Sequence, residues 1–190
     1  MLVLASSSPR RQQILSDAGI RYIVRASNVP EVLRTGELPG DYVRRLAEEK
    51  AFALPIQPGE VVLAADTVVV VAEQVLEKPQ DQADAARMLA LLSGQTHEVL
   101  TGICLHSETQ KIVDVATTRV HFAQLSAQEI EEYVRSGEPM DKAGAYAIQG
   151  RASKFIDRIE GCYFNVVGLP MALVYRHLKK FGWLDYSRSA

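Results

Sequence analysis

The sequence predicts an α/β protein with a mixed, twisted sheet that is flanked by helices and bent around a cleft. Three observations predict this fold class. Strand-like and helix-like segments alternate at the start and the end of the chain, the middle is rich in β-forming residues, and neither an internal repeat nor a long linker divides the sequence. We therefore expect one domain over residues 1–190.

The beginning of the chain predicts two strands around a helix. Leu2 to Ala5 is a short apolar run that suits a buried strand. Ser8 and Pro9 then suit the cap and the first position of a helix, and Gly19 ends it. A second strand is expected from Tyr22 to Arg25.

A loop and four further elements follow in the first half. Residues 28–40 are rich in proline and glycine and predict a loop, which leads into a helix over residues 41–54. Residues 61–71 form the most apolar stretch and predict a strand, which residues 75–76 continue after a turn. Residues 81–92 are helical by their alanine, methionine and leucine content.

The middle of the chain predicts two long strands and one helix. Residues 97–105 and 112–122 are β-rich and are joined by a polar turn. Ser126 and Glu129 have the spacing of a capping box, in which each side chain satisfies a free backbone N–H of the other. The helix that they open is expected to end at Gly137.

The last part of the chain predicts a loop, two short strands and a closing helix. Residues 138–150 contain two glycines and are expected as a loop, and residues 154–159 and 163–167 are expected as strands. A helix over residues 170–181 completes the alternation, with two lysines in its last turn where their charge is favourable.

Composition and charge exclude several classes of protein. The chain is 47% apolar and 23% charged, which is typical of a globular protein and not of a disordered or collagen-like one. Its net charge is -2, whereas proteins that coat nucleic acid or anionic membranes carry a basic excess. We therefore expect neither a nucleic acid polymer nor a membrane as partner. Cys104 and Cys162 lie far apart, which argues against a disulfide framework or zinc site and favours a cytoplasmic location.

The first candidate site is the junction between the first strand and the first helix. Three serines at residues 6–8 precede Pro9, Arg10 and Arg11 there. A helix N-terminus offers free N–H groups and a positive dipole end to a phosphate, and arginine binds phosphate oxygens in pairs. The alternative is a capped helix with two solvated arginines.

Two charged residues at apolar positions are the next candidates. Lys50 lies on the apolar stripe of its helix, four residues after Leu46, so its ammonium either reaches solvent or meets an anion. Asp66 and Thr67 interrupt the apolar run of residues 61–71. An aspartate at a strand end beside a cleft can hold a metal or activate water, and the alternative is a turn aspartate between two strands.

More polar groups adjoin expected strand ends, namely Lys78 and, in the segment 139–150, Asp141, Lys142 and Gln149. Together with the residues above they predict a cationic pocket that also contains carboxylates. Such a pocket suits a triphosphate with a divalent cation, because lysine and arginine neutralise phosphates and carboxylates bind Mg²⁺. The chain has neither a Walker sequence nor a G-x-G-x-x-G fingerprint, which argues against P-loop and Rossmann chemistry.

A series of short motifs runs from residue 2 to about residue 182. They are Leu4-Ala5-Ser6-Ser7-Ser8-Pro9-Arg10-Arg11, Glu31, Lys50, Ala65-Asp66-Thr67, Leu76-Glu77-Lys78-Pro79, Leu92-Ser93-Gly94 with Thr96-His97, Asp141-Lys142-Ala143-Gly144 and Val167-Gly168-Leu169-Pro170. In this order and over nearly the whole chain, they resemble the Maf family.

The resemblance implies a nucleoside triphosphate pyrophosphatase with two lobes around a deep cleft, an architecture shared with pyrophosphatases that clear inosine and xanthosine triphosphates. Such enzymes cleave a nucleotide between its α and β phosphates and use a divalent metal cation, Mg²⁺ or Mn²⁺. The resemblance also implies a homodimer, and the family name reflects an effect on septum formation, so a role in cell division arrest is a further expectation.

Within the family, Thr67 and the segment 145–150 look like the branch that acts on dTTP and UTP. A sister branch, which acts on 7-methyl-GTP, tends to carry serine in place of Thr67 and glutamate in place of Gln149. Ala147 departs from the pattern of its own branch, where glycine is usual. The implied substrates include modified pyrimidine nucleotides.

The resemblance assigns a role to each candidate residue. Asp66 is expected as the general base and a metal contact, Glu31 as the second metal carboxylate, and Lys50 and Lys78 as catalytic cations that neutralise the phosphates. The expected substrate-binding residues are Ser8, Arg10, Arg11, Thr67, Asp141, Lys142 and Gln149, of which Arg10, Thr67 and Gln149 select the base.

Two alternatives remain open at this point. One is a pyrophosphatase of another specificity, for 7-methyl-GTP or inosine-type nucleotides. The other is a non-catalytic, nucleotide-binding regulator of septum formation. Asp66 argues against the regulator, because the binding of a triphosphate alone gains nothing from an additional negative charge.

Overall fold

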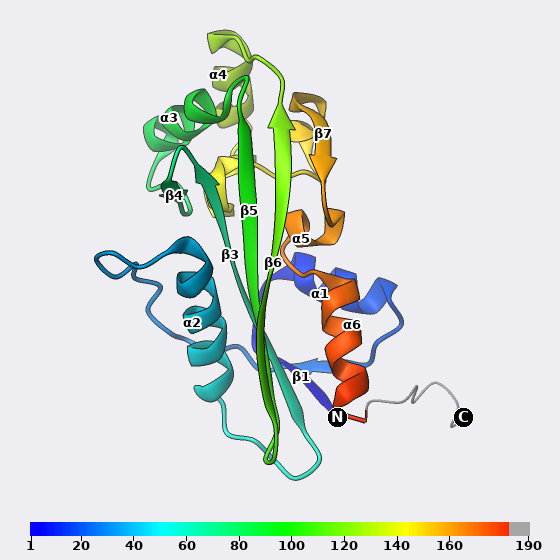
Figure 1. Cartoon of the computed structure of the whole chain (residues 1–190). Helices are drawn as coiled ribbons and strands as arrows, with labels where there is room; N and C mark the ends of the chain where they lie inside the picture. Colours follow the sequence, from blue (N-terminus) through cyan, green and yellow to red (C-terminus); the bar gives the residue numbers. More distant parts are fainter. Residues whose placement is uncertain (183–190) are drawn as a thin grey trace.

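The computed structural model describes residues 1–182, so the last eight residues of the expected domain lie outside the described residues. A seven-stranded sheet runs through the molecule in the order β2-β1-β3-β5-β6-β7, with β4 paired to β3 (Figure 1). The strands are β1 (Leu2–Leu4), β2 (Tyr22–Val24), β3 (Val61–Val71), β4 (Gln74–Leu76), β5 (Thr96–His106), β6 (Lys111–Phe122) and β7 (Ile156–Glu160).

The sheet is mixed, as the sequence predicts. β1 pairs in parallel with β2 and β3, and all other pairs are antiparallel. The helices that flank it are α1 (Pro9–Asp17), α2 (Pro39–Phe52), α3 (Gln82–Leu92), α4 (Ala127–Arg135), α5 (Tyr163–Val167) and α6 (Met171–Lys180). Three short 3₁₀ helices, η1 (Glu138–Asp141), η2 (Ala143–Ala145) and η3 (Arg151–Phe155), lie between α4 and β7.

The long strands β3, β5 and β6 run through two lobes (Figure 1). One lobe contains β1, β2, α1, α2 and α6, and the other contains β4, α3, α4 and β7. Along one edge of β3, β1 pairs as far as Leu63 and β4 pairs from Val69 onward. The edge between these two points has no strand beside it among residues 1–182, and this gap is where a cleft can open.

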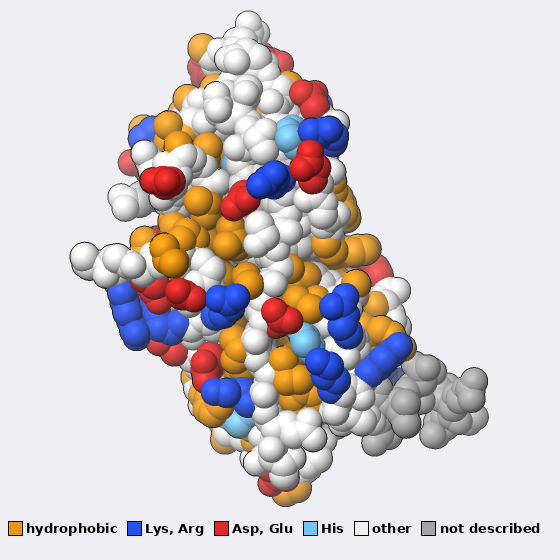
Figure 2. All heavy atoms as spheres, in the orientation of Figure 1, with side chains coloured by type: hydrophobic (Ala, Val, Ile, Leu, Met, Phe, Trp, Pro, Cys, Tyr) orange, Lys and Arg blue, Asp and Glu red, His pale blue; other side chains and the backbone are white. Residues whose placement is uncertain are grey.

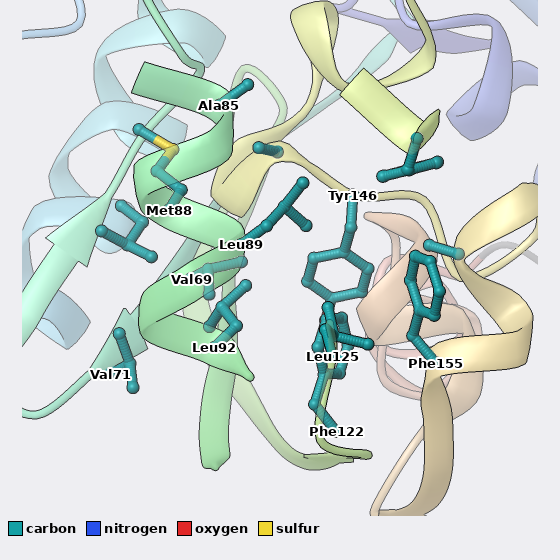
Figure 3. Close-up of a cluster of buried hydrophobic side chains, with 14 of the residues drawn as sticks. Val69, Val71, Ala85, Met88, Leu89, Leu92, Phe122, Leu125, Tyr146 and Phe155 are labelled. Carbon is teal, nitrogen blue, oxygen red and sulfur yellow. The ribbon is translucent and has the colours of Figure 1, made fainter. Parts of the chain in front are cut away.

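Each lobe has a hydrophobic core of its own. In the second lobe α3 packs against β3, β6 and the segment after α4, and its side chains Leu89 and Leu92 are fully buried (Figure 3). Each such leucine stabilises the fold by roughly 1.5–3 kcal/mol relative to an exposed one. In the first lobe Leu15 and Leu178 pack against β1 and β3 from α1 and α6. The two cores lie on either side of the cleft.

A close approach fixes α2 on the sheet. A Cβ atom on Gly102 of β5 would lie 2.2 Å from the carbonyl oxygen of Val43 in α2. Only glycine therefore allows α2 to lie this close to the sheet, and α2 is the helix that carries Lys50.

Several predicted elements differ from the observed ones. The loop predicted over residues 138–150 contains the 3₁₀ helices η1 and η2. Residues 163–167 form the helix α5, so the predicted strand there is wrong. Buried Asn165 donates hydrogen bonds to Val99 O and Thr118 Oγ1, and these contacts outweigh the β propensity of its neighbours. The strand predicted over residues 154–159 is β7, which begins two residues later. The predicted helix over residues 41–54 begins at Pro39, a favourable first position.

Acidic and basic side chains are interspersed on the face seen in Figure 2, in agreement with the balanced net charge. No helix within residues 1–182 combines the length and the apolar character that crossing a bilayer requires.

Candidate active site

A cleft of about 490 Å³ opens between the lobes, beside the unpaired edge of β3. Its lining comes from the β1–α1 junction, the loop before α2, α2 itself, β3, the segment after β4, β5, the segment around η1 and η2, and the end of α5. All eleven predicted site residues line it: Ser8, Arg10, Arg11, Glu31, Lys50, Asp66, Thr67, Lys78, Asp141, Lys142 and Gln149. The structure thus brings together residues that lie up to 141 positions apart.

Asp66 lies in the middle of β3, which is one continuous strand of 11 residues. Both the expected placement at a strand end and the alternative of a turn aspartate are therefore wrong. The position nevertheless faces the cleft, because β1 ends opposite Leu63 and leaves the following part of the β3 edge open. Side chains alternate along a strand, so Asp66 and Thr67 project from opposite faces of the sheet.

A buried cation joins the two carboxylates of the site. Lys50 Nζ lies 2.5 Å from Asp66 Oδ1 and 2.5 Å from Glu31 Oε1. Lys50 and Asp66 are only 8% and 6% exposed, so solvent screens their charges weakly. Lys50 therefore meets an anion and does not reach out to solvent.

The cations around Glu31 determine its protonation. Partial burial would raise the pKa of the Glu31 carboxyl, but the hydrogen bond and the charge of Lys50 outweigh it and hold that pKa below its usual value. Lys78, whose Nζ lies 3.9 Å from Glu31 Oε2, and Arg11 contribute in the same direction. Glu31 is consequently ionised at neutral pH.

The Arg11 guanidinium donates hydrogen bonds to three groups of the protein. Its Nε donates to Gly168 O at 2.8 Å, its Nη1 to Ser6 Oγ at 3.1 Å, and its Nη2 to Thr67 Oγ1 at 3.2 Å. Burial lowers the pKa of the guanidinium from a very high value, so it remains charged. Since arginine has five N–H groups, two remain to meet a ligand in the cleft.

The hydroxyl of Thr67 has a fixed orientation. Thr101 Oγ1 donates its one proton to Asn165 O, at 3.2 Å, so in the 2.9 Å contact between the two threonines Thr67 is the donor. Thr67 also accepts from Arg11. It can therefore offer a ligand one lone pair but no proton.

An ion pair connects the two lobes across the cleft. Arg10 Nη1 on α1 lies 3.3 Å from Asp141 Oδ2 in η1, and Lys142 Nζ lies 2.5 Å from Asp141 Oδ1. Desolvation would raise the pKa of Asp141, but Lys142 and then Arg10 outweigh it and lower that pKa. Asp141 thus orients two cations at the mouth of the cleft.

Ser8 and Gln149 are free to meet a ligand. Ser8 occupies the N-cap position of α1, but its side chain makes no capping hydrogen bond, contrary to the expected cap. The side chain of Gln149 is exposed and has no hydrogen-bond partner within the part of the chain that the structure describes.

The site also contains residues that sequence reasoning did not assign. Tyr42 Oη on α2 donates to Glu77 Oε1 at 2.5 Å, and both residues line the cleft. Burial, followed by the hydrogen bond to Glu77, raises the pKa of Tyr42, so the hydroxyl keeps its proton. The backbone N–H of Gly144 in η2 donates to the carbonyl oxygen of Glu77 at 3.0 Å. These contacts fix the backbone that carries Lys78, and the only sequence indication was that Glu77 precedes Lys78.

The carboxylates fit a cation that binds together with a triphosphate. Among residues 1–182 no group of three or more His, Cys, Asp or Glu side chains could hold a metal by itself. Glu31 and Asp66 each have one oxygen that is not bonded to Lys50. Mg²⁺ in phosphate-transfer enzymes needs only one or two carboxylates, because phosphate oxygens and water complete its coordination.

Known proteins resemble this chain over nearly its whole length. A dTTP/UTP pyrophosphatase from Koribacter versatilis is 53% identical over 184 residues, which cover 96% of this chain and 95% of that protein. One from Symbiobacterium thermophilum is 49% identical over 190 residues, covering 100% of this chain and 98% of that protein.

A solved structure shares the fold. The Staphylococcus aureus Ham1 protein aligns over 95% of this chain and 98% of its own with a TM-score of 0.51, at 16% identity. The family model described as Maf-like protein matches residues 1–181, a range that includes every residue lining the cleft. On this match and on the identity to its relatives, the chain belongs to the Maf family.

Proposed function

We propose that the protein hydrolyses dTTP and UTP between the α and β phosphates and releases the nucleoside monophosphate and pyrophosphate. The observation that carries this proposal is the buried Asp66 carboxylate, which Lys50 holds at the edge of a cleft lined by further cations. Relatives with this activity in their names are about half identical to the chain over nearly its full length, which supports the same substrates.

In the proposed reaction Asp66 is the general base. Lys50 holds Oδ1 of Asp66, which leaves Oδ2 to accept a proton from water. The water oxygen forms a bond to the α phosphorus, the bond from that phosphorus to the bridging oxygen breaks, and its electron pair leaves with pyrophosphate. Arg10, Arg11 and Lys78 neutralise the charge that gathers on the leaving group.

A divalent cation, Mg²⁺ or Mn²⁺, is part of the proposal. Glu31 and Asp66 would hold it through the oxygens that Lys50 leaves free, and the second lone pair of Asp66 Oδ2 would then accept the proton of water. Such a cation withdraws charge from the phosphate oxygens and makes the α phosphorus more electrophilic. Cytoplasmic location stays a prediction from the two distant cysteines, and a homodimeric state and a role in cell division arrest stay predictions from the family resemblance.

Arg10, Thr67 and Gln149 are proposed to select the base. Uracil and thymine present a ring N–H between two carbonyl oxygens. The Gln149 carboxamide can accept from that N–H and donate to a neighbouring carbonyl, and Arg10 can only donate. Since the Thr67 proton is committed to Thr101, Thr67 can only accept.

A panel of nucleoside triphosphates tests the function. We expect pyrophosphate release from UTP, dTTP and 5-methyluridine triphosphate, and much slower release from 7-methyl-GTP and ITP. Faster release from either purine nucleotide would assign the other specificity. Tight binding of UTP without turnover of any triphosphate, in the presence of Mg²⁺ or Mn²⁺, would favour the regulator.

A further inference from the structure

The loop over residues 28–38 carries Glu31 into the cleft, yet little holds its backbone. Within the described chain none of residues 28–33 takes part in a backbone–backbone hydrogen bond. Val32 and Leu33 are 64% and 40% exposed, so hydrophobic packing does not fix the loop either. The position of Glu31 therefore depends on side-chain contacts.

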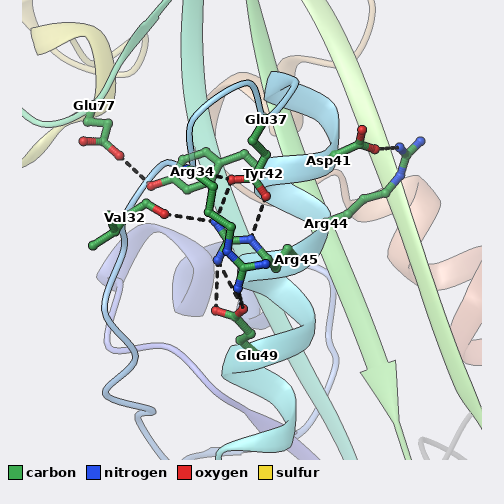
Figure 4. A network of polar contacts seen from close by, with 9 residues as sticks. All are labelled: Val32, Arg34, Glu37, Asp41, Tyr42, Arg44, Arg45, Glu49 and Glu77. Carbon is green, nitrogen blue, oxygen red and sulfur yellow. Dashed lines mark hydrogen bonds and ion pairs between the residues drawn. The ribbon is translucent and has the colours of Figure 1, made fainter.

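Arg45 on α2 supplies these contacts with all five of its N–H groups (Figure 4). Its Nε and Nη2 donate to the two carboxylate oxygens of Glu37 at 2.6 and 2.7 Å. The second N–H of Nη2 donates to Val32 O at 3.0 Å. Nη1 donates to both carboxylate oxygens of Glu49 at 3.1 and 3.2 Å, which anchors the guanidinium to its own helix.

Both loop contacts of Arg45 follow Glu31 in the sequence. Val32 directly follows Glu31, so the hydrogen bond to the Val32 carbonyl restrains the backbone one residue after Glu31, and Glu37 holds the far end of the loop. Lys50, five residues further along α2, binds the Glu31 carboxylate itself. Helix α2 thus holds the loop at these three points, and at a fourth where Arg34 Nη2 lies 3.2 Å from Glu49 Oε1.

The ion pair between Arg45 and Glu37 is largely shielded from solvent, and its carboxylate stays charged. The side chains of Arg45 and Glu37 are 16% and 12% exposed, so water competes poorly for their paired hydrogen bonds. The hydrogen bonds from Arg45 lower the pKa of Glu37 to about 2, and the carboxylate stays ionised over the whole physiological range.

We propose that Arg45 is a positioning residue, which clamps the loop over residues 28–38 so that Glu31 stays beside Lys50 and Asp66. Arg45 is not among the residues that line the cleft, so it acts through Glu31 and touches no substrate. The inference rests on the proposed function only insofar as turnover reports on Glu31.

A double-mutant cycle on UTP hydrolysis separates this role from a general structural one. Arg45→Gln should lower kcat by roughly 10–100-fold, the usual effect of losing a residue that orients a ligand. In the Glu31→Gln background the same change should cost less than about threefold, because the group that Arg45 orients is already gone. Equal losses in both backgrounds would overturn the proposal.

Arg44→Gln is the matched control. Arg44 is the adjacent residue on α2, it pairs with Asp41 at 3.1 Å, and within the described residues it makes no hydrogen bond or ion pair with the loop. The control should stay within about twofold of the parent. A loss as large as that of Arg45→Gln would attribute the effect to the charge of the helix and overturn the proposal.

Trypsin cleavage after Arg34, inside the loop, gives a readout that needs no enzymatic activity. A released loop should be cut at least about tenfold faster in Arg45→Gln than in the parent, and no faster in Arg44→Gln, because cleavage follows local opening. Glu37→Gln removes the ion pair but retains Arg45. If Arg45→Gln does not fold, the cleavage rate of Glu37→Gln is measured in its place. Unchanged cleavage of the folded variant would overturn the clamp. If the parent hydrolyses no triphosphate, the proposed function fails, while the cleavage rates still test the clamp.

Discussion

Lys50 Nζ lies 2.5 Å from Oδ1 of Asp66, and the two residues are less than one-tenth exposed. Removing two charges from water is costly, and a buried pair is tolerated only when the charges compensate each other. Replacing Lys50 would leave the Asp66 charge buried without its cation, whereas replacing Asp66 would leave Lys50 paired with Glu31. The cluster therefore couples the stability of the fold to the chemistry of the cleft.

Lys50→Met should destabilise the protein much more than Lys78→Met. The first change leaves Asp66 without its buried partner and should lower the free energy of unfolding by about 3–5 kcal/mol. The side chain of Lys78 is 62% exposed and its Nζ lies 3.9 Å from Glu31, so the matched change should cost less than about 1 kcal/mol. Urea denaturation at pH 7 measures both values. Similar losses of unfolding free energy for the two variants would show that the buried ion pair contributes no more to stability than the exposed one.

Asp66→Asn should slow UTP hydrolysis by roughly 10²–10⁴-fold, because the amide cannot accept the proton of the attacking water. The carboxamide oxygen can still accept from Lys50, so the fold should persist. Steady-state kinetics and circular dichroism check the two statements. Asp157→Asn, at an exposed position of β7, makes the same chemical change away from the cleft and should leave the rate unchanged. Near-normal turnover of Asp66→Asn would remove Asp66 from the mechanism.

His97 should make stability depend on pH. It is 1% exposed, its Nε2 lies 2.8 Å from Tyr146 Oη, and its Nδ1 has no partner within residues 1–182. Burial lowers the pKa of His97 to about 3, so the unfolded chain binds a proton at this residue below about pH 6.5 and the folded chain does not.

Stability must then fall with falling pH between about 6 and 4, and His97 should contribute a slope of about 1.4 kcal/mol per pH unit. Well above pH 6.5 both states are neutral at His97 and its contribution to the slope vanishes. His97→Gln keeps a polar group beside Tyr146 but does not titrate, so its slope should be smaller by that amount. Equal slopes for parent and variant, measured by urea denaturation across this range, would contradict the neutral buried histidine.

Gln149→Glu should reduce kcat/KM for UTP and dTTP while thermal stability and metal dependence stay normal. The new carboxylate oxygen would face a pyrimidine carbonyl, and a mismatched polar contact of this kind costs more than about 1 kcal/mol. Gln110→Glu, in the exposed turn between β5 and β6, is the control with the same charge change. Unchanged efficiency with both pyrimidine nucleotides would leave base selection to Arg10 and Thr67.

Local patterns were sufficient to predict most of the fold. The capping box at Ser126 and the apolar run of β3 are determined by neighbours in the sequence, and both elements form where they were expected. Helix α5 was missed because its apolar and aromatic residues favour a strand. The hydrogen bonds from Asn165 to Val99 in β5 and Thr118 in β6 favour the helix, and no local sequence pattern indicates these contacts.

The residues of the candidate site likewise include some that a local sequence pattern indicates and some that it does not. Lys50 and Asp66 stand out in the sequence because charges interrupt apolar positions, whereas Glu31 was assigned only through the family resemblance. Arg45 lies among other charged residues of α2 and is indistinguishable there from a solvated helix face. Its contacts depend on how a loop eight to thirteen residues away folds back onto the helix, and only the structure shows this.

The identity of the products from UTP tests the central claim most directly. With Mg²⁺ or Mn²⁺ present, chromatography of the reaction mixture should show UMP and pyrophosphate in equal amounts from the first turnovers, and neither product should form with Asp66→Asn at a comparable rate. The appearance of UDP and orthophosphate instead would contradict the assignment of this cleft to hydrolysis between the α and β phosphates.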